Sequence, residues 1–353
     1  MNFRRLLGNL SITSSGLAKY QGIANFLKWF NGYSPFPVNI DFILTMRCNL
    51  NCPFCVCSQE GNTEIVANFR RPELSWEEWK GIVNDIKRSF FFRPNINLLG
   101  GEPSIYKGYL DLARHIKSQG FRCSYTTNGT FLARDAAEIV DTGIDVIAVS
   151  IDGGPQLHNQ TRGEGVFDRA AEGIRAINVE REKHAQNAPF LFLACTINDK
   201  NHDRLTQLIE TARDLEIKYV NFLHLQFPDV EMGKYHIDTG ALIQQVQATR
   251  QLAKEYNIAV NFTPPLKTQD IATYYLEPSG QLGKGCISPW LRMVIMPNGK
   301  VIPCGDHVVG DLKAEGETIK SVWNSARFRA FRRNLAEKGL LPDCERCCRK
   351  QYY

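Results

Sequence analysis

Strand-like and helix-like segments alternate along most of the chain, and this order restricts the fold more than any other feature of the sequence. Six short runs have the length and composition of β-strands, the first of them alternating apolar and polar residues, and a helical pattern follows each one. The runs occupy residues 38–44, 96–100, 121–127, 145–151, 189–197 and 219–225. This alternation predicts a parallel sheet. Because six units are too few for a closed eight-stranded barrel, we expect an α/β fold with a partial (βα)6 parallel barrel, whose active site lies at the C-terminal ends of the strands.

Several helix boundaries carry local signals. Ser75 and Glu78 have the spacing of a capping box, which predicts a helix that begins directly after Ser75. Gly143 stands where a C-cap glycine would end another helix. Further helical patterns cover residues from about 108 to 118, from about 167 onward, and from about 239 to 256.

The character of the sequence changes after about residue 265. Residues 291–304 (LRMVIMPNGKVIPC) predict two short strands joined by a turn at Asn298-Gly299, and a helical segment at 318–339 follows. We therefore expect three parts. They are a helical N-terminal leader at 1–37, a core barrel at 38–265, and a small C-terminal β-hairpin and helix domain at 266–353.

The leader contains an amphipathic segment, residues 16–30 (GLAKYQGIANFLKWF). We expect this segment to form a helix that packs on the core domain, with contact to a membrane surface as the alternative. No run of the chain approaches the roughly 18 apolar residues that cross a membrane. The N-terminal residues are also too polar for a secretory signal. The cytoplasm is therefore the expected location.

Composition and charge bear on the classes of partner. Hydrophobic residues make up 43% of the chain and charged residues 22%, which is typical of a globular protein, and the net charge of +5 is mild. Basic residues are scattered, and the one basic cluster, at 327–333, is interpreted as a solvated helix face. Because no basic stripe with interleaved aromatic residues is present, we expect no nucleic-acid partner.

The chain contains 11 cysteines, and most of them are clustered. Four lie between residues 48 and 57, and three lie between residues 344 and 348. Thiolates that bind one metal centre must be close in space, so tight clustering favours metal ligation. A disulfide framework is not expected in a chain of this size without a secretory signal.

The first cysteine group directly follows the first predicted strand. Cys48, Cys52 and Cys55 have the spacing C-x3-C-x2-C, which allows a compact loop to bind three irons of a cubane cluster. The fourth iron would then lack a protein ligand and be able to bind a substrate. A structural zinc site with Cys57 as the fourth ligand is the alternative, although such sites usually pair two C-x2-C steps.

At these residues the chain resembles the radical S-adenosylmethionine (SAM) superfamily. The cysteine spacing matches its signature, with the aromatic residue Phe54 before the third cysteine, and residues 100–103 (Gly-Gly-Glu-Pro) match its GGEP motif. The resemblance implies that SAM binds the open iron and is cleaved by one electron to methionine and a 5′-deoxyadenosyl radical. That radical would abstract a hydrogen atom from the substrate. An ordinary Gly/Pro turn is the alternative interpretation of the GGEP residues.

The resemblance also implies a set of SAM contacts at the ends of the strands. Glu102 would accept hydrogen bonds from the methionine ammonium group, and Arg162 would contact the methionine carboxylate, with a surface ion pair as its alternative. Ser150 and Asp152 resemble the positions that contact the ribose, and Asp152 also fits a turn. The complete expected set is Phe54, Gly100, Gly101, Glu102, Pro103, Asn128, Ser150, Asp152, Arg162 and Asn198.

The second cysteine group resembles the C-terminal extension called SPASM, or its shortened form called Twitch. Its expected ligands for an auxiliary 4Fe–4S cluster are Cys286, Cys304, Cys344 and Cys347. Cys348 is a spare, or the substitute for Cys347. The full SPASM pattern has seven cysteines, so five predict a single auxiliary cluster. A closed zinc site is the alternative, because four thiolates also suit tetrahedral zinc.

We therefore expect a radical SAM enzyme with two 4Fe–4S clusters that oxidises, epimerises or forms bonds in a small-molecule or peptide substrate. A maturase for the side chains of ribosomal peptides or proteins is the alternative. A non-enzymatic electron carrier would not need the GGEP residues. The expected reductant is a ferredoxin or flavodoxin. The candidate catalytic residues are Cys195, as a hydrogen-atom donor or else a small buried hydrophobe, and Asp306, as a base near the substrate or else a surface turn residue.

Overall fold

The protein is represented by a computed structural model, which describes residues 31–58, 69, 72–226, 233–277, 285–341, 344, 346 and 347. The amphipathic segment predicted at 16–30 and Cys348 lie outside these residues. No helix within the described ranges is both long enough and apolar enough to cross a membrane.

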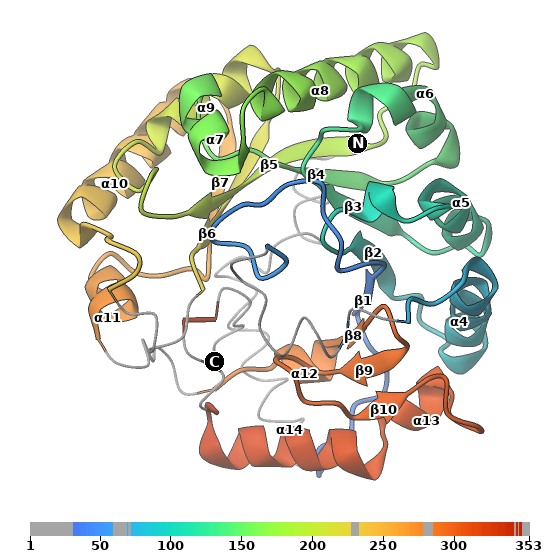
Figure 1. Ribbon diagram of the computed structural model, residues 1–353. Helices are drawn as coiled ribbons and strands as arrows, with labels where there is room; N and C mark the ends of the chain where they lie inside the picture. Colours follow the sequence, from blue (N-terminus) through green and yellow to red (C-terminus); the bar gives the residue numbers. More distant parts are fainter. Residues whose placement is uncertain are drawn as a thin grey trace.

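One sheet forms the centre of the molecule, with the strand order β10-β9-β8-β1-β2-β3-β4-β5-β6-β7 (Figure 1). All neighbours from β8 to β7 are parallel, whereas β9 is antiparallel to both β8 and β10. The strands are β1 (Asn39–Ile43), β2 (Asn95–Leu99), β3 (Cys123–Thr127), β4 (Val146–Ser150), β5 (Phe190–Ile197), β6 (Tyr219–His224), β7 (Ala259–Thr263), β8 (Arg292–Ile295), β9 (Lys300–Ile302) and β10 (Gly310–Asp311).

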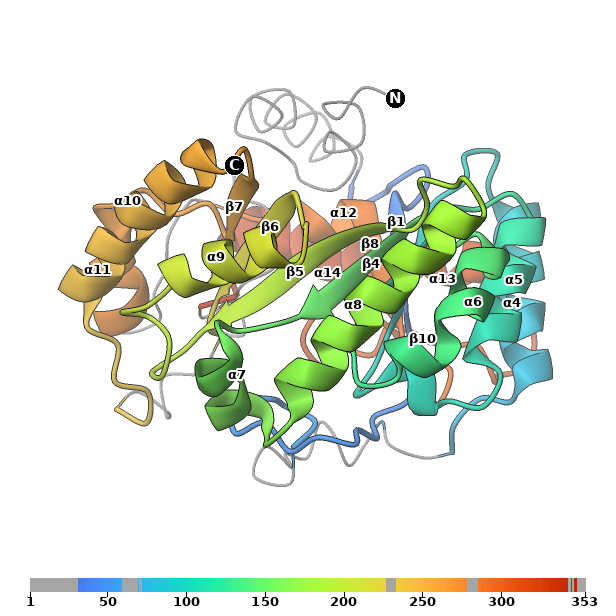
Figure 2. The same cartoon turned by 90° about the horizontal axis from the view of Figure 1, so that it is seen from above.

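Helices cover the outer, convex side of the curved sheet (Figures 1 and 2). On this side lie α4 (Trp76–Ser89), α5 (Tyr109–Ser118), α6 (Leu132–Thr142), α7 (Pro155–Arg162), α8 (Val166–Lys183), α9 (Thr206–Asp214) and α10 (Thr239–Glu255). The chain also forms α11 (Asp270–Leu276), α12 (Ser288–Leu291), α13 (Ile319–Trp323) and α14 (Ala326–Lys338). A short 3₁₀ helix spans Pro103–Ile105. The expected α/β class with a parallel sheet is confirmed.

Alternate residues of each strand point toward these helices. In β1, Ile40 and Phe42 are fully buried and belong to the main hydrophobic core, where the Phe42 ring stacks on Trp79 of α4. The residues between them, Asn39 and Asp41, therefore lie on the opposite, inner face of the sheet, because side chains alternate along a strand. The core thus lies between the sheet and the outer helices, and the inner face is separate from it.

Local signals in the sequence correctly placed several elements. Ser75 caps α4 through a capping box with Glu78, and Gly143 ends α6 with a left-handed φ of 72°. All six predicted strands are present. A seventh parallel strand, β7, pairs with β6 and was not predicted.

The C-terminal hairpin continues the barrel sheet. Its first strand, β8, pairs in parallel with β1, so Arg292 reaches the inner face beside the fully buried Asp41 and forms an ion pair with it. The turn between β8 and β9 contains Gly299, whose φ of 84° suits glycine. The sequence therefore predicted the hairpin correctly but not its attachment to the edge of the barrel.

The helical segment predicted at 318–339 is two helices, α13 and α14. The helical conformation is interrupted at Asn324, which ends α13, and the Ser325 side chain then accepts a hydrogen bond from the Phe328 N–H to cap α14. The interpretation of 327–333 as a solvated helix face is wrong for Arg332, which is fully buried. Its guanidinium donates to the carbonyl oxygens of Gly32, Pro289 and Trp323 and joins three distant segments.

Candidate active site

The cysteine loop is held against the end of β2 by backbone contacts. The N–H of Gly101 donates to the Thr45 carbonyl oxygen, and the N–H of Glu102 donates to that of Arg47, both at 2.8 Å. A Cβ atom on Gly101 would lie 2.2 Å from the Arg47 carbonyl oxygen, and one on Gly100 would lie 2.6 Å from that of Thr45. Glycine is therefore required at both positions, because the backbone leading into Cys48 passes directly over them.

The thiols of Cys48, Cys52 and Cys55 lie close enough to affect one another electrostatically. Burial raises the pKa of Cys52 to about 11, and the neighbouring Cys55 and Cys48 add to this rise. Burial also raises the pKa of Cys48. In contrast, a hydrogen bond from the Cys57 side chain lowers the pKa of Cys55 to about 6. Two of the sulfurs already accept backbone hydrogen bonds at 3.4 Å, from Leu50 to Cys48 and from Cys57 to Cys55.

Glu102 is fully buried at the end of β2. Its Oε1 accepts hydrogen bonds from the Ser104 hydroxyl at 2.6 Å, the Thr127 hydroxyl at 3.0 Å and the Tyr125 hydroxyl at 3.1 Å. Its Oε2 accepts one bond from the Asn128 N–H at 2.8 Å. Oε1 is thus saturated by the protein, whereas Oε2 retains capacity for a further donor.

Arg162 and Asp152 form an ion pair between α7 and the end of β4. The Nε atom of Arg162 lies 2.6 Å from Oδ2 of Asp152, and Nη2 lies 3.2 Å from Oδ1. The guanidinium carbon also lies 5.5 Å from the centre of the Phe54 ring. Its positive charge opposes the rise that burial causes in the pKa of Cys52, and adds to the Cys57 hydrogen bond in lowering the pKa of Cys55. Arg162 therefore connects the end of β4 to the cysteine loop.

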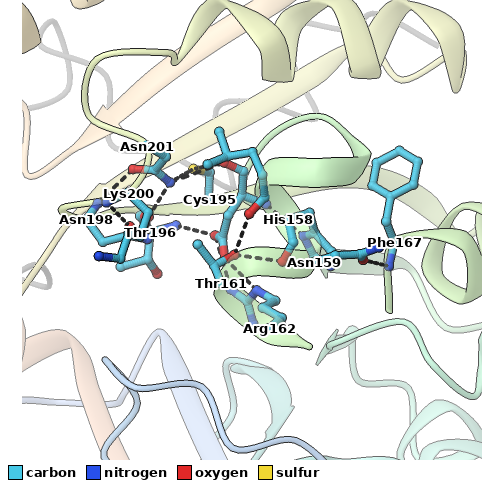
Figure 3. A network of polar contacts seen from close by, with 12 residues as sticks. His158, Asn159, Thr161, Arg162, Phe167, Cys195, Thr196, Asn198, Lys200 and Asn201 are labelled. Atoms are coloured by element: carbon cyan, nitrogen blue, oxygen red, sulfur yellow. Dashed lines mark hydrogen bonds and ion pairs between the residues drawn. The ribbon is translucent and has the colours of Figure 1, made fainter. Parts of the chain in front are cut away.

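A polar network surrounds Asp152 and contains residues that sequence reasoning missed (Figure 3). The Thr196 N–H donates to Oδ1 of Asp152, and the Asp152 N–H donates to Nδ1 of His158. Asn201 is fully buried, and its amide donates to the Asp152 carbonyl oxygen at 3.2 Å. Burial lowers the pKa of His158 to about 4, so this ring is a neutral acceptor. No sequence motif distinguished Asn201 from an ordinary turn residue.

The other predicted strand-end residues have different surroundings. Asn128 donates to Asn49 at 2.8 Å and lies 3.9 Å from the sulfur of Cys48, so it approaches the cysteine loop. Ser150 is half-buried at the end of β4. Asn198 is fully buried, and its side chain bonds to the backbone of Thr196 and Lys200, which shapes the loop after β5.

The C-terminal cysteines occupy a separate region. Cys286 and Cys344 belong to one hydrophobic cluster together with Trp290, Leu335 and Leu341. Cys304 follows β9, and Cys347 is half-buried. Within the described residues, no three His, Cys, Asp or Glu side chains converge as they would on one metal ion. Thiolates of a cubane each bind a different iron, so they lie further apart than the ligands of a single ion.

The two candidate catalytic residues lie in contrasting places. Cys195 is fully buried on the helix side of β5, where burial raises its pKa well above the ordinary value. Asp306 is exposed in the loop after Cys304. Its neighbour His307 packs on Phe331, which contacts the cluster around Cys286. The structure therefore does not bring Cys195 and Asp306 into a common site.

Comparison with known protein families agrees with this geometry. Residues 42–180 match the model of the radical SAM superfamily, and residues 286–348 match that of the SPASM iron–sulfur cluster-binding domain. The chain is therefore a radical SAM enzyme with a C-terminal SPASM domain. Its cofactors are SAM and 4Fe–4S clusters, as the resemblance implied.

Individual relatives are distant but extend over most of the chain. A PqqA peptide cyclase from Rhodopseudomonas palustris is 25% identical over 328 residues, which cover 89% of this chain and 80% of the relative. An AdoMet-dependent heme synthase from Methanosarcina barkeri is 26% identical over 337 residues and 88% of each chain. Among solved structures, Streptococcus suis SuiB bound to the precursor peptide SuiA has a TM-score of 0.65 at 15% identity, and covers 90% of this chain and 71% of its own. This last likeness concerns the fold.

Proposed function

We propose that Cys48, Cys52 and Cys55 hold the 4Fe–4S cluster that binds SAM. The observation that carries this proposal is the meeting of these thiols at the end of β1, with hydrogen bonds to two of the sulfurs and the positive charge of Arg162 beside them. Backbone N–H donors and a neighbouring cation stabilise thiolates, which are the form that binds iron. The donor set therefore fits an iron–sulfur cluster with one open iron.

SAM would lie along the C-terminal ends of β2 to β5. In this assignment, Oε2 of Glu102 accepts a hydrogen bond from the methionine ammonium group, since this oxygen has capacity for one more donor. Arg162 binds the methionine carboxylate while its Nε holds Asp152, and Ser150 lies beside the ribose. The remaining residues of the proposed site shape this edge, and they are Phe54, Gly100, Gly101, Pro103, Asn128, Asp152 and Asn198.

Bound together, the cluster and SAM supply a one-electron cleavage of the S–C5′ bond, which yields methionine and a 5′-deoxyadenosyl radical that takes a hydrogen atom from the substrate. The electron would come from a reduced ferredoxin or flavodoxin. The task of this chain is to orient the reactants and to exclude water. Two buried sets of hydrogen bonds suit this task, because each holds its carboxylate rigidly: Asn128 and neighbouring hydroxyls hold Glu102, and Asn201 bonds to the backbone of Asp152.

A second 4Fe–4S cluster would bind Cys286, Cys304, Cys344 and Cys347. Their segment is anchored, because Arg332 binds the Pro289 carbonyl oxygen and Cys286 packs against Trp290 and Leu335. Four thiolates saturate a cubane, so this cluster would transfer an electron rather than bind the substrate. We also propose that the core barrel spans 38–265 and the auxiliary domain spans 266–353.

Two substrate classes follow from the names of the relatives. One relative is a peptide cyclase and SuiB was solved with a precursor peptide, whereas another relative makes haem, a porphyrin. We propose that this enzyme acts on a peptide. A porphyrin or another small molecule is the competing class.

The proposed site is tested by SAM cleavage. Anaerobic enzyme, reconstituted with iron and sulfide and reduced with dithionite, is expected to form 5′-deoxyadenosine from SAM. The triple variant Cys48→Ala, Cys52→Ala, Cys55→Ala should form none. The buried Cys123→Ala variant is the control, because this thiol lies on the helix side of β3. Formation of 5′-deoxyadenosine at the wild-type rate by the triple variant would overturn the assignment.

A further inference from the structure

The inner face of the sheet, opposite the helices, carries polar side chains where a closed barrel would carry branched apolar ones. On β6 and β7 these include Asn221, Asn261 and Thr263, and each is half-buried. The inference that follows rests on the proposed function and concerns the substrate of that same site.

Asn221 and Asn261 are paired in register on neighbouring strands. The Nδ2 of Asn261 donates to Oδ1 of Asn221 and to the Thr263 hydroxyl, both at 2.9 Å. The Thr263 hydroxyl in turn donates to Oδ1 of Asn221 at 3.0 Å. These bonds use both hydrogens of the Asn261 amide and both lone pairs of the Asn221 carbonyl oxygen.

The same bonds leave one donor and one acceptor side by side. The Nδ2 group of Asn221 and the Oδ1 atom of Asn261 make no hydrogen bond with any part of the chain that the structure describes. Because the three bonds fix both amides, the donor and the acceptor are held in place before a ligand arrives. A peptide bond or a carboxamide presents the complementary acceptor and donor.

Asn221 and Asn261 are in register with Ser150 of the proposed SAM site, through the pairing of β4, β5, β6 and β7. Ser150 pairs with Ala194 of β5, Ala194 pairs with Asn221, and Asn221 pairs with Asn261. Neighbouring strands lie about 4.8 Å apart, so Asn221 is two strands, or roughly 10 Å, from Ser150. A group bound by the pair would therefore be a near neighbour of the ribose position.

The surroundings of the pair are apolar and uncharged. Between Ser150 and Asn221 the inner face carries Ala194, and the Phe192 and Tyr219 rings lie in contact with centres 5.3 Å apart. Among the described strand residues of this face, those on β4 to β7 are all uncharged. The charged ones, Asp41, Arg292, Lys300 and Asp311, lie on β1 and β8 to β10, and Asp41 and Arg292 form an ion pair. A polycarboxylate such as a porphyrin would need basic partners here, whereas an apolar side chain next to an amide would not.

We propose that Asn221 and Asn261 bind a backbone amide of a peptide substrate and place a neighbouring apolar side chain against the β4–β5 part of the inner face. The pair determines specificity, because it matches an amide in both donor and acceptor and offers no charge to an acidic ligand.

The experiment uses the reconstituted enzyme and random twelve-residue peptides made from fully deuterated amino acids. Mass spectrometry measures deuterium in the 5′-deoxyadenosine that is formed. Wild-type enzyme should incorporate deuterium, and Asn221→Leu and Asn261→Leu should each reduce this incorporation roughly tenfold, because one or two hydrogen bonds are lost. The matched control is Asn95→Leu, since the Asn95 amide of β2 donates to Asn39 of β1 on the same face, several strands away from Asn221 and Asn261.

The remaining outcomes distinguish failure of the amide assignment from failure of the proposed function. If 5′-deoxyadenosine forms but no peptide transfers deuterium to it, the amide assignment is overturned while SAM cleavage stands. The amide assignment is also overturned if Asn95→Leu loses as much deuterium transfer as the two test variants. It is overturned as well if iron coproporphyrin III stimulates SAM cleavage equally in wild type and in Asn221→Leu. If no protein forms 5′-deoxyadenosine, the proposed function itself fails.

Discussion

Arg162 of α7 and Asp152 after β4 form a forked ion pair that is almost completely shielded from water, with Nε 2.6 Å from Oδ2. The same guanidinium lies over Phe54 in the cysteine loop, so one residue joins the strand end to the proposed cluster site. The pair and this ring contact therefore help to fasten the cysteine loop to the end of β4. The ion pair also implies that the two residues act together.

Replacing Arg162 by Met should destabilise the protein by about 3–5 kcal/mol, because the buried Asp152 carboxylate would lose its counter-charge. The free energy of unfolding of the cluster-free protein, measured in urea, checks this. The double variant Asp152→Asn, Arg162→Met should recover part of the loss, since no charge is then left unpaired. A single variant as stable as wild type would show that the pair contributes nothing.

Replacing Gly101 by Ala should prevent the cysteine loop from forming properly. Its Cβ would lie 2.2 Å from the Arg47 carbonyl oxygen, so the backbone before Cys48 must move. We expect the iron content after reconstitution to fall from about eight to about four per chain, because the auxiliary cluster remains. Gly81→Ala in α4 is the matched control. A Cβ atom at this position would meet no atom within 4 Å apart from the nearby backbone of its own helix, and alanine should stabilise the helix by about 0.5–1 kcal/mol. Unchanged iron content in Gly101→Ala would contradict the account.

The reactivity of Cys55 should depend on Cys57. In cluster-free, reduced protein, alkylation of Cys55 by iodoacetamide should rise through a midpoint near pH 6, because the thiolate forms above its pKa of about 6. Cys57→Ala removes the side-chain hydrogen bond that lowers this pKa most, so the midpoint should move to higher pH. Ser58→Ala keeps its backbone N–H and serves as the control. An identical midpoint in Cys57→Ala would rule out this role of Cys57.

Replacing Glu102 by Gln should weaken SAM binding roughly tenfold or more, since hydrogen bonds to charged groups are typically about 1.5–3 kcal/mol. The amide would also direct an N–H group toward the donors that now surround the carboxylate. Equilibrium dialysis with reconstituted enzyme measures the dissociation constant. Glu138→Gln, on the exposed face of α6, should leave it unchanged. If Glu102→Gln binds SAM as wild type does, Glu102 has only a structural role.

Local sequence signals predicted the barrel strands and several helix ends, because each signal depends on few neighbouring residues. The capping box at Ser75, which begins α4, and Gly143, which ends α6, are signals of this kind. Strand β7 was missed because Asn261 interrupts its short apolar pattern and only pairing with β6 supports it. The contact between β8 and β1 was also missed, since Arg292 and Asp41 are 251 residues apart and no local pattern encodes their pairing.

The candidate site was predictable where motifs are compact. The spacing of Cys48, Cys52 and Cys55 and the GGEP residues needed no knowledge of the fold. The pairing of Asp152 with Arg162 was not foreseen, because an ion pair was considered for Arg162 only at the surface and without a named partner. The hydrogen bonds of Asn221 with Asn261 depend on strand register, which the sequence does not display.

The most direct test of the central claim is the position of SAM relative to the cluster. SAM labelled with ¹⁵N in its amino group is added to reduced enzyme, and electron–nuclear double resonance measures the coupling of this nucleus to the cluster. We expect coupling in wild type and in a variant with Cys286, Cys304, Cys344 and Cys347 replaced by Ala. We expect none in the Cys48→Ala, Cys52→Ala, Cys55→Ala variant. Coupling that persists in this last variant would contradict the account.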